Sequence, residues 1–192
     1  MYVDPTGKLA FLTMLFISMG VGFIVSGGFE IGKQVQTHGW NLSKWNWAEI
    51  GTAALIGAAN GLAYGLGGIA GGILKGSFQA LSIAGKTLTT WQSVGVLFGV
   101  SAVTNFATGF ASYAANAKES NTGNFNIFKG FSEGTGQMLK GLLSFLTAGM
   151  YVGAGLWNVG ADAKNTLSSI IERTVSRFIV NYIPNYIFDE LF

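Results

Sequence analysis

One uncharged stretch of the sequence, Ile50 to Leu74, contains glycines that recur at steps of three or four residues and continue just past its end. At about 100° per residue they fall on one face of a helix, within roughly 100° of arc. Large aliphatic side chains such as Leu66 and Ile73 fall on the opposite face. We expect the glycine face to contact other helices and Leu66→Ala to matter less than a glycine replacement. The glycines are Gly57, Gly61, Gly65, Gly68, Gly72 and Gly76.

A helix with this many glycines suits lipid better than water. Each interior glycine costs about 1 kcal/mol of helix stability relative to alanine. In a membrane, small residues let two backbones approach closely, which helps helices associate there. The composition agrees, since 10% of the residues are charged, against about 25% in soluble domains. The sequence therefore predicts an all-α, glycine-rich domain of membrane type; a soluble glycine-rich helical domain is the alternative.

Four uncharged runs predict about four hydrophobic helices. The first, Leu9 to Gly28, has about 20 residues, enough to cross a hydrocarbon core of about 30 Å. A cleaved signal peptide is an alternative for this run. Glycines at helical spacing recur in the later runs and are predicted packing positions: Gly95 and Gly99 in Val94 to Ala117, and Gly149 and Gly153 in Gly141 to Gly160.

The predicted organisation follows from these runs and from the polar segments between them. From Asn165 to Ile183 apolar residues form one stripe of an amphipathic helix, which Pro184 should end. Such a helix either lies in the membrane interface or packs on a neighbouring helix. No strand signal of comparable strength occurs. We expect a junction turn (1–7), a glycine-rich hydrophobic helical region (8–117), a polar hinge (118–136), and a hydrophobic helix with a C-terminal amphipathic helix (137–192).

All five tryptophans lie near the ends of the uncharged runs. Tryptophan gathers at the membrane interface, with its ring among the headgroups and its indole N–H toward water. The alternative is that they anchor a small soluble core. Basic residues divide almost evenly between the two ends of the predicted bundle and do not fix its orientation. The predicted interface residues are Trp40, Trp45, Trp47, Trp91 and Trp157.

Several function classes find no support in the residues. The net charge of +2 does not favour a nucleic-acid partner, and a chain with one histidine and no cysteine has no two-histidine or thiolate metal site. His38 has only Glu30 and Glu49 near it in sequence, so a loop residue explains it better than catalysis. The glycines at 65–72 lack the GK[ST] of a phosphate-binding loop. We predict no catalytic residue, no metal, no cofactor and no enzymatic activity.

The N-terminal residues Tyr2 to Gly7 read YVDPTG, in which Asp4, Pro5 and Gly7 form a type I turn. This motif, followed by an apolar region, resembles the junction of YD-repeat (Rhs) proteins, bacterial polymorphic toxins whose repeat shell ends in DPxG before a variable C-terminal domain. The glycine-rich segment Trp47 to Gly61 is also similar to segments behind that junction. The resemblance implies that Asp4 corresponds to an aspartate of a self-cleavage site and that Met1 is internal to a longer protein.

The resemblance and the apolar runs together predict a membrane-inserting effector or translocation segment of a contact-dependent bacterial toxin, with pore formation as its mode of action. Its expected location is the membrane, as a delivered or secreted protein acting in the envelope of the target cell. The expected partners are the lipid bilayer, further copies of the chain in a homo-oligomer, an immunity protein and the upstream repeat shell. Two alternatives remain: a structural or translocation module without toxicity, and a soluble helical toxin with an enzymatic activity that the sequence does not reveal.

Overall fold

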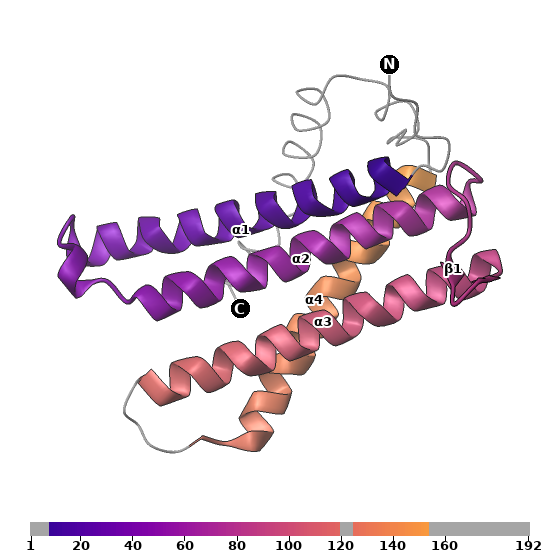
Figure 1. Cartoon of the computed structure of the whole chain (residues 1–192). Coiled ribbons are helices and arrows are strands. Elements are labelled where there is room, and N and C mark those ends of the chain that lie inside the picture. Colours follow the sequence, from indigo (N-terminus) through magenta and orange to yellow (C-terminus); the bar gives the residue numbers. More distant parts are fainter. Residues whose placement is uncertain (1–7, 120–124, 154–192) are drawn as a thin grey trace.

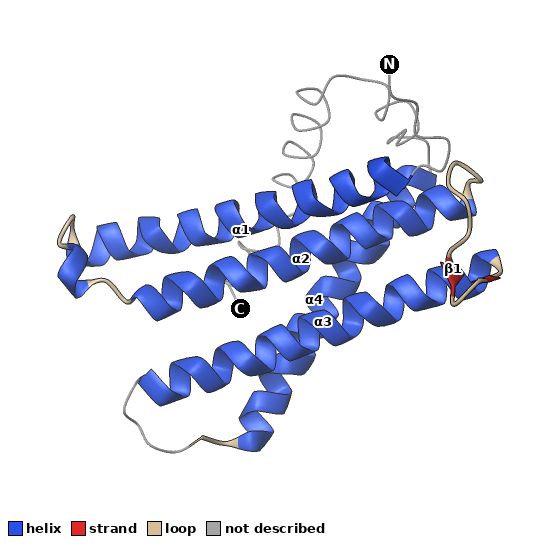
Figure 2. Cartoon of the chain, viewed as in Figure 1, coloured by secondary structure: helices blue, strands red, loops and turns tan. Residues whose placement is uncertain are grey.

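The computed structural model describes residues 8–119 and 125–153, and this part of the chain is all-α, as the sequence predicts. Long helices dominate it, joined by short connections (Figures 1 and 2). Three predicted features lie outside the described residues: the junction turn at Asp4, Pro5 and Gly7, the interface residue Trp157, and the C-terminal amphipathic helix. The long helices are α1 (Lys8–His38), α2 (Trp47–Leu74), α3 (Thr90–Glu119) and α4 (Ile127–Gly153).

The ends of α2 follow from capping. Its first turn is capped by Asn46, whose side chain accepts a hydrogen bond from the backbone N–H of Glu49 at 3.0 Å. At the other end, the N–H of Gly76 donates to the carbonyl of Ile73 (3.1 Å), and the N–H of Ser77 to that of Gly72 (2.8 Å). This pair of bonds is a Schellman motif, in which glycine supplies the positive φ of 75°. Gly76 therefore ends the helix, and its predicted role in helix packing is wrong.

The predicted polar hinge at 118–136 is wrong over residues 127–136, which form the first turns of α4. Asn126 caps this helix, because its side chain accepts hydrogen bonds from two backbone N–H groups of the first turn at 2.9 and 3.3 Å. Gly130 and Gly134 then let the helix lie against phenylalanine rings of α3. Local capping and close packing thus override the polar composition of the segment.

The connection between α2 and α3 contains a small hairpin that the sequence analysis did not predict. Strand β1 (Ser82–Ile83) pairs antiparallel with β2 (Lys86–Thr87). The two turn residues, Ala84 and Gly85, have φ values of 50° and 78°, as a type I′ turn requires. Strands of two residues are too short to show the alternation by which strands are recognised in a sequence. The other connection, between α1 and α2, contains a short 3₁₀ helix, η1 (Leu42–Lys44).

Helix α2 is the centre of the bundle. It contacts α1, α3 and α4, and α3 and α4 also pack on each other. In Figure 1, α1 lies along α2, whereas α4 crosses both α2 and α3. Within the most apolar window of each helix, 72% of α2 is buried but only 22% of α1 and of α3. The outer helices therefore leave most of their apolar surface uncovered in the described part of the chain.

Candidate functional site

The first glycine face of α2 lies against α1. A Cβ built on Gly57 would overlap the backbone carbonyl oxygen of Gly22, and one built on Gly61 would overlap that of Ser18. A Cβ on Gly65 would lie 3.1 Å from the hydroxyl oxygen of Ser18. These three predicted packing positions thus lie where the backbones of two helices meet, and a side chain at Gly57 or Gly61 would force them apart.

Helix α1 supplies small residues to the same contact, which the sequence analysis did not single out. Gly22 is buried, and its own added Cβ would overlap the carbonyl oxygen of Gly57. Ser18 is 0% exposed and donates a hydrogen bond from its hydroxyl to the carbonyl of Met14 at 2.7 Å. Because the hydroxyl is satisfied within its own helix, serine can face a neighbouring backbone at little cost. The spacing of Ser18, Gly22 and Ser26 by four residues is the signal that could have identified this face.

A second glycine face of α2, also not predicted, lies against α4. A Cβ on Gly67 would overlap the backbone carbonyl oxygen of Phe145, and a Cβ on Gly71 would lie 2.7 Å from that of Gly149. Gly149, a predicted packing position, therefore lies in the contact between α2 and α4. Gly67 and Gly71 are four residues apart, so their spacing carries the same signal as that of the first face.

The large side chains of α2 are not a separate outward face. Leu66, Ile69 and Ile73 are 4%, 1% and 4% exposed and belong to the main core, whereas Leu55 is 57% exposed. The expectation that replacing Leu66 has a smaller effect than replacing a glycine assumed that Leu66 lies outside the helix contacts. That assumption is wrong. Helices α1, α3 and α4 pack around α2, so both its glycine positions and much of its aliphatic surface are buried.

The other predicted packing glycines lie in different surroundings. Gly68 is buried within α2, and Gly72 lies against the ring of Phe78, which folds back from the connection to α3. A Cβ on Gly95 or on Gly99 would meet no atom within 4 Å. The prediction that these two glycines pack against a neighbouring helix is wrong for the described bundle. Gly153 is the last residue of α4.

The described tryptophans lie at opposite ends of the bundle. Trp40, Trp45 and Trp47 cluster at the connection between α1 and α2, and Trp91 lies at the start of α3. Trp45 is 8% exposed and its indole N–H donates to the carbonyl of Gly39 at 3.0 Å. The other three are between 57% and 78% exposed. Trp45 thus anchors the local core, while exposed rings remain at both ends.

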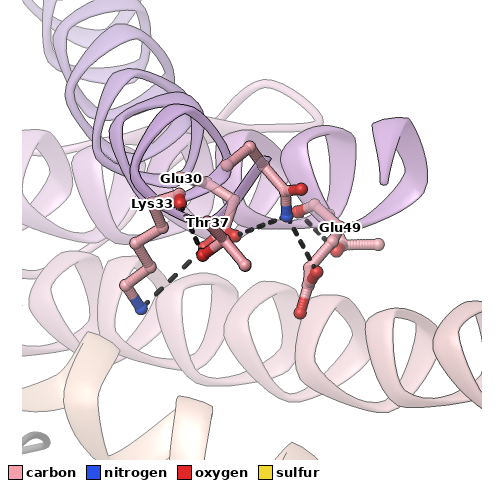
Figure 3. A network of polar contacts seen from close by, with 6 residues as sticks. Glu30, Lys33, Thr37 and Glu49 are labelled. Carbon is pink, nitrogen blue, oxygen red and sulfur yellow. Dashed lines mark hydrogen bonds and ion pairs between the residues drawn. The ribbon is translucent and has the colours of Figure 1, made fainter. Parts of the chain in front are cut away.

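A polar network closes the end of the α1–α2 pair (Figure 3). The amide nitrogen of Gln34 donates to a carboxylate oxygen of Glu30 at 3.3 Å and to one of Glu49 at 3.1 Å. Its amide oxygen accepts from the backbone N–H of Asn46 at 3.2 Å, and Lys33 pairs with Glu30 at 3.9 Å. Since Gln34 is only 6% exposed, one neutral side chain ties the last turns of α1 to the first turn of α2.

The residues considered for catalysis or metal binding form no shared site in the described part of the chain. His38 ends α1 and is exposed. Within the described residues, no group of three or more histidine, cysteine, aspartate or glutamate side chains lies close enough to hold a metal ion. Glu30 and Glu49 both accept hydrogen bonds from the amide of Gln34 in the polar network described above.

Polar and apolar residues share the buried contacts of the described bundle, while many large apolar residues are exposed. Polar residues such as Ser18, Ser101 and Asn105 are at most 1% exposed. Large apolar residues such as Ile69 are buried beside them, but many others are exposed, and an extensive exposed apolar surface marks contact with a partner or a membrane. Three helices, α1, α2 and α3, are long and apolar enough to cross a membrane by length and composition. The exposed apolar residues include Leu12, Phe16, Phe23 and Ile24 on α1, Val100 and Val103 on α3, and Leu143, Leu146 and Met150 on α4.

Comparison of the chain with family models, curated proteins and solved structures finds no match.

Proposed function

We propose that the chain is a membrane-embedded helical domain. The observation that carries this proposal is the large number of apolar side chains exposed on the described helices, together with small and polar residues in the contacts between them. Lipid tails are as apolar as leucine, so such an outer surface is stable in a bilayer, and close backbone packing holds the helices together. Exposed tryptophans at both ends of the bundle, Trp40 and Trp91, support the proposal, because tryptophan gathers at membrane interfaces.

We further propose that this domain is the effector of a contact-dependent bacterial toxin, which inserts in the envelope of a target cell and lets ions cross. The support is the YVDPTG motif, which resembles the DPxG junction of YD-repeat proteins, directly before the apolar helices. The partners proposed with it are the lipid bilayer, further copies of the chain, an immunity protein and an upstream repeat shell. A translocation segment would share the membrane location but would not depolarise the target.

The proposed location is tested by expressing the full chain in a bacterial cell and washing the membrane fraction with alkaline carbonate. We expect the chain to remain in the membrane, because peripheral proteins are released by this treatment and embedded helices are not. Release of the chain into the supernatant as a folded species would contradict the proposal.

The proposed activity is tested in the same cells with a potential-sensitive dye. Expression should depolarise the membrane and leave nucleic acids intact. Gly61→Leu should abolish depolarisation, because the new side chain would enter the contact with α1. Gly51→Leu is the matched control, since Gly51 lies on the same helix and a Cβ there meets no atom within 4 Å. If the chain is embedded in the membrane but does not depolarise it, the alternative function of a translocation segment remains. Depolarisation that survives Gly61→Leu would show that the packing of α1 on α2 is not required.

A further inference from the structure

The face that α3 turns toward the bundle carries several buried polar residues, together with Leu97, which is 4% exposed and belongs to the main core. The buried polar residues of this face recur along the helix at steps of eight, four and seven residues, which places them within roughly 120° of arc. The opposite face carries Val96 and Val103, which are 36% and 69% exposed. Buried polar residues of α3 thus lie on its inward side, and exposed valines lie on its outward side. The polar residues, each at most 7% exposed, are Ser93, Ser101, Asn105 and Ser112; we call them the polar face of α3.

Two oxygen atoms at this level of the bundle are buried without a hydrogen-bond partner. They are the hydroxyl oxygen of Ser101, on a residue 0% exposed, and the side-chain oxygen of Asn60 on α2, on a residue 6% exposed. The amide nitrogen of Asn105 connects the two helices here, donating to the carbonyl of Ser101 at 2.9 Å and to that of Ala59 at 3.4 Å. Buried polar atoms are almost always paired, and a bound water or ion is one of the ways in which such an atom is satisfied.

The contact between α2 and α3 differs from the other helix contacts. Between α1 and α2 the backbones of Gly57 and Gly22 meet directly, and between α2 and α4 the backbone of Gly67 meets that of Phe145. Between α3 and α4, a Cβ on Gly141 would overlap the carboxamide of Asn105. Between α2 and α3, in contrast, the carboxamide of Asn105 reaches across to the backbone of Ala59. A polar side chain therefore bridges α2 and α3 at this level.

We propose that the polar face of α3 and Asn60 of α2 line the path by which water and monovalent ions cross the membrane. This inference rests on the proposed function, since it names the place of conduction within a membrane-embedded domain. Polar residues at the middle of membrane helices mark such pathways, because lipid offers them no partner. The lining residues are neutral, so the path discriminates only weakly between small cations and anions.

The absence of cysteine from the sequence allows a direct test. Single cysteines are introduced in the full chain, reconstituted in planar bilayers, and treated with a charged, water-soluble methanethiosulfonate reagent. The reagent should lower the conductance several-fold for Ser101→Cys and Asn105→Cys, because it attaches a bulky group inside the path. Val103→Cys, on the opposite face of the same helix, and the cysteine-free parent should keep their conductance. Ser112→Cys provides a second lining position if a central substitution prevents folding.

The outcomes separate this inference from the proposed function. A conducting chain that is blocked at Val103→Cys, or at none of the lining positions, places the path elsewhere and overturns the inference, but it leaves the membrane-embedded domain intact. A chain that stays in carbonate-washed membranes and conducts nothing also overturns it. A chain that carbonate releases overturns the proposed function, and the path with it.

Discussion

Two glycines of α1, only two residues apart, give the sharpest test of the close packing between α1 and α2. Gly22 is buried, and a Cβ there would overlap the carbonyl oxygen of Gly57 and lie 2.8 Å from its carbon. Gly20 is exposed, and a Cβ there would meet no atom within 4 Å. Both positions lie well inside the helix, so Gly→Ala changes the intrinsic helix preference by the same amount at each.

The expected magnitude follows from two opposing contributions. Replacing an interior glycine with alanine favours the helix by about 1 kcal/mol. At Gly22 the added methyl group must also displace backbone atoms of α2, which cannot rotate away, and such overpacking typically costs about 1–3 kcal/mol. The helix preference cancels between the two variants. We therefore expect Gly22→Ala to be less stable than Gly20→Ala by about 1–3 kcal/mol.

Both purified variants are unfolded in mild detergent micelles by titration with a denaturing detergent. Unfolding is followed by the change in tryptophan fluorescence and by the loss of the helical signal. The parent chain supplies the reference. Free energies of unfolding for the two variants that agree within about 0.5 kcal/mol, the usual effect of a surface substitution, would show that α1 and α2 do not approach each other at Gly22.

Further substitutions test the core, the tryptophan cluster and the polar network in the same unfolding assay. Leu66→Ala should cost about 2–5 kcal/mol because a large side chain leaves a packed core, whereas Leu55→Ala, at a position 57% exposed, should cost under about 0.5 kcal/mol; similar losses would contradict the central position of α2. Trp45→Phe removes a buried hydrogen bond and should cost about 0.5–1.5 kcal/mol, and an effect no larger than that of Trp40→Phe would show that the burial of Trp45 is not maintained. Gln34→Leu should destabilise the chain by about 1–3 kcal/mol, since it leaves the adjacent carboxylates and a backbone N–H without their partner; unchanged stability would show that the network does not hold the helix pair.

The sequence predicted the apolar helices well, because uncharged runs of this length have few other stable forms. The run Ile50 to Leu74 lies within α2, and Val94 to Ala117 lies within α3. The helix that begins with the first run continues to His38, past the predicted end at Gly28. Its last turns are polar, and Gln34 ties them to α2. A contact between segments 15 residues apart in the sequence cannot be read from hydropathy.

The turns and the polar segments were predicted less well, because single residues decide them. Gly76 continued the spacing of the glycine stripe, but it ends α2 through backbone hydrogen bonds that use its positive φ. The hinge was expected where the composition is polar, yet the cap at Asn126 starts a helix there. In both cases the local backbone geometry of one residue outweighs the average property of its neighbours.

The greatest difference concerns which face of a helix contacts protein. In water, apolar periodicity identifies the buried face, because burial of apolar surface is favourable. In a bilayer it does not, since a leucine against lipid and a leucine against a helix have nearly the same surroundings. Leu66 and Leu55 are therefore indistinguishable in the sequence, although one is 4% and the other 57% exposed. Small and polar residues carry the information instead, and the spacing of Gly67 with Gly71 or of Ser101 with Asn105 marks contacts that hydrophobicity alone does not.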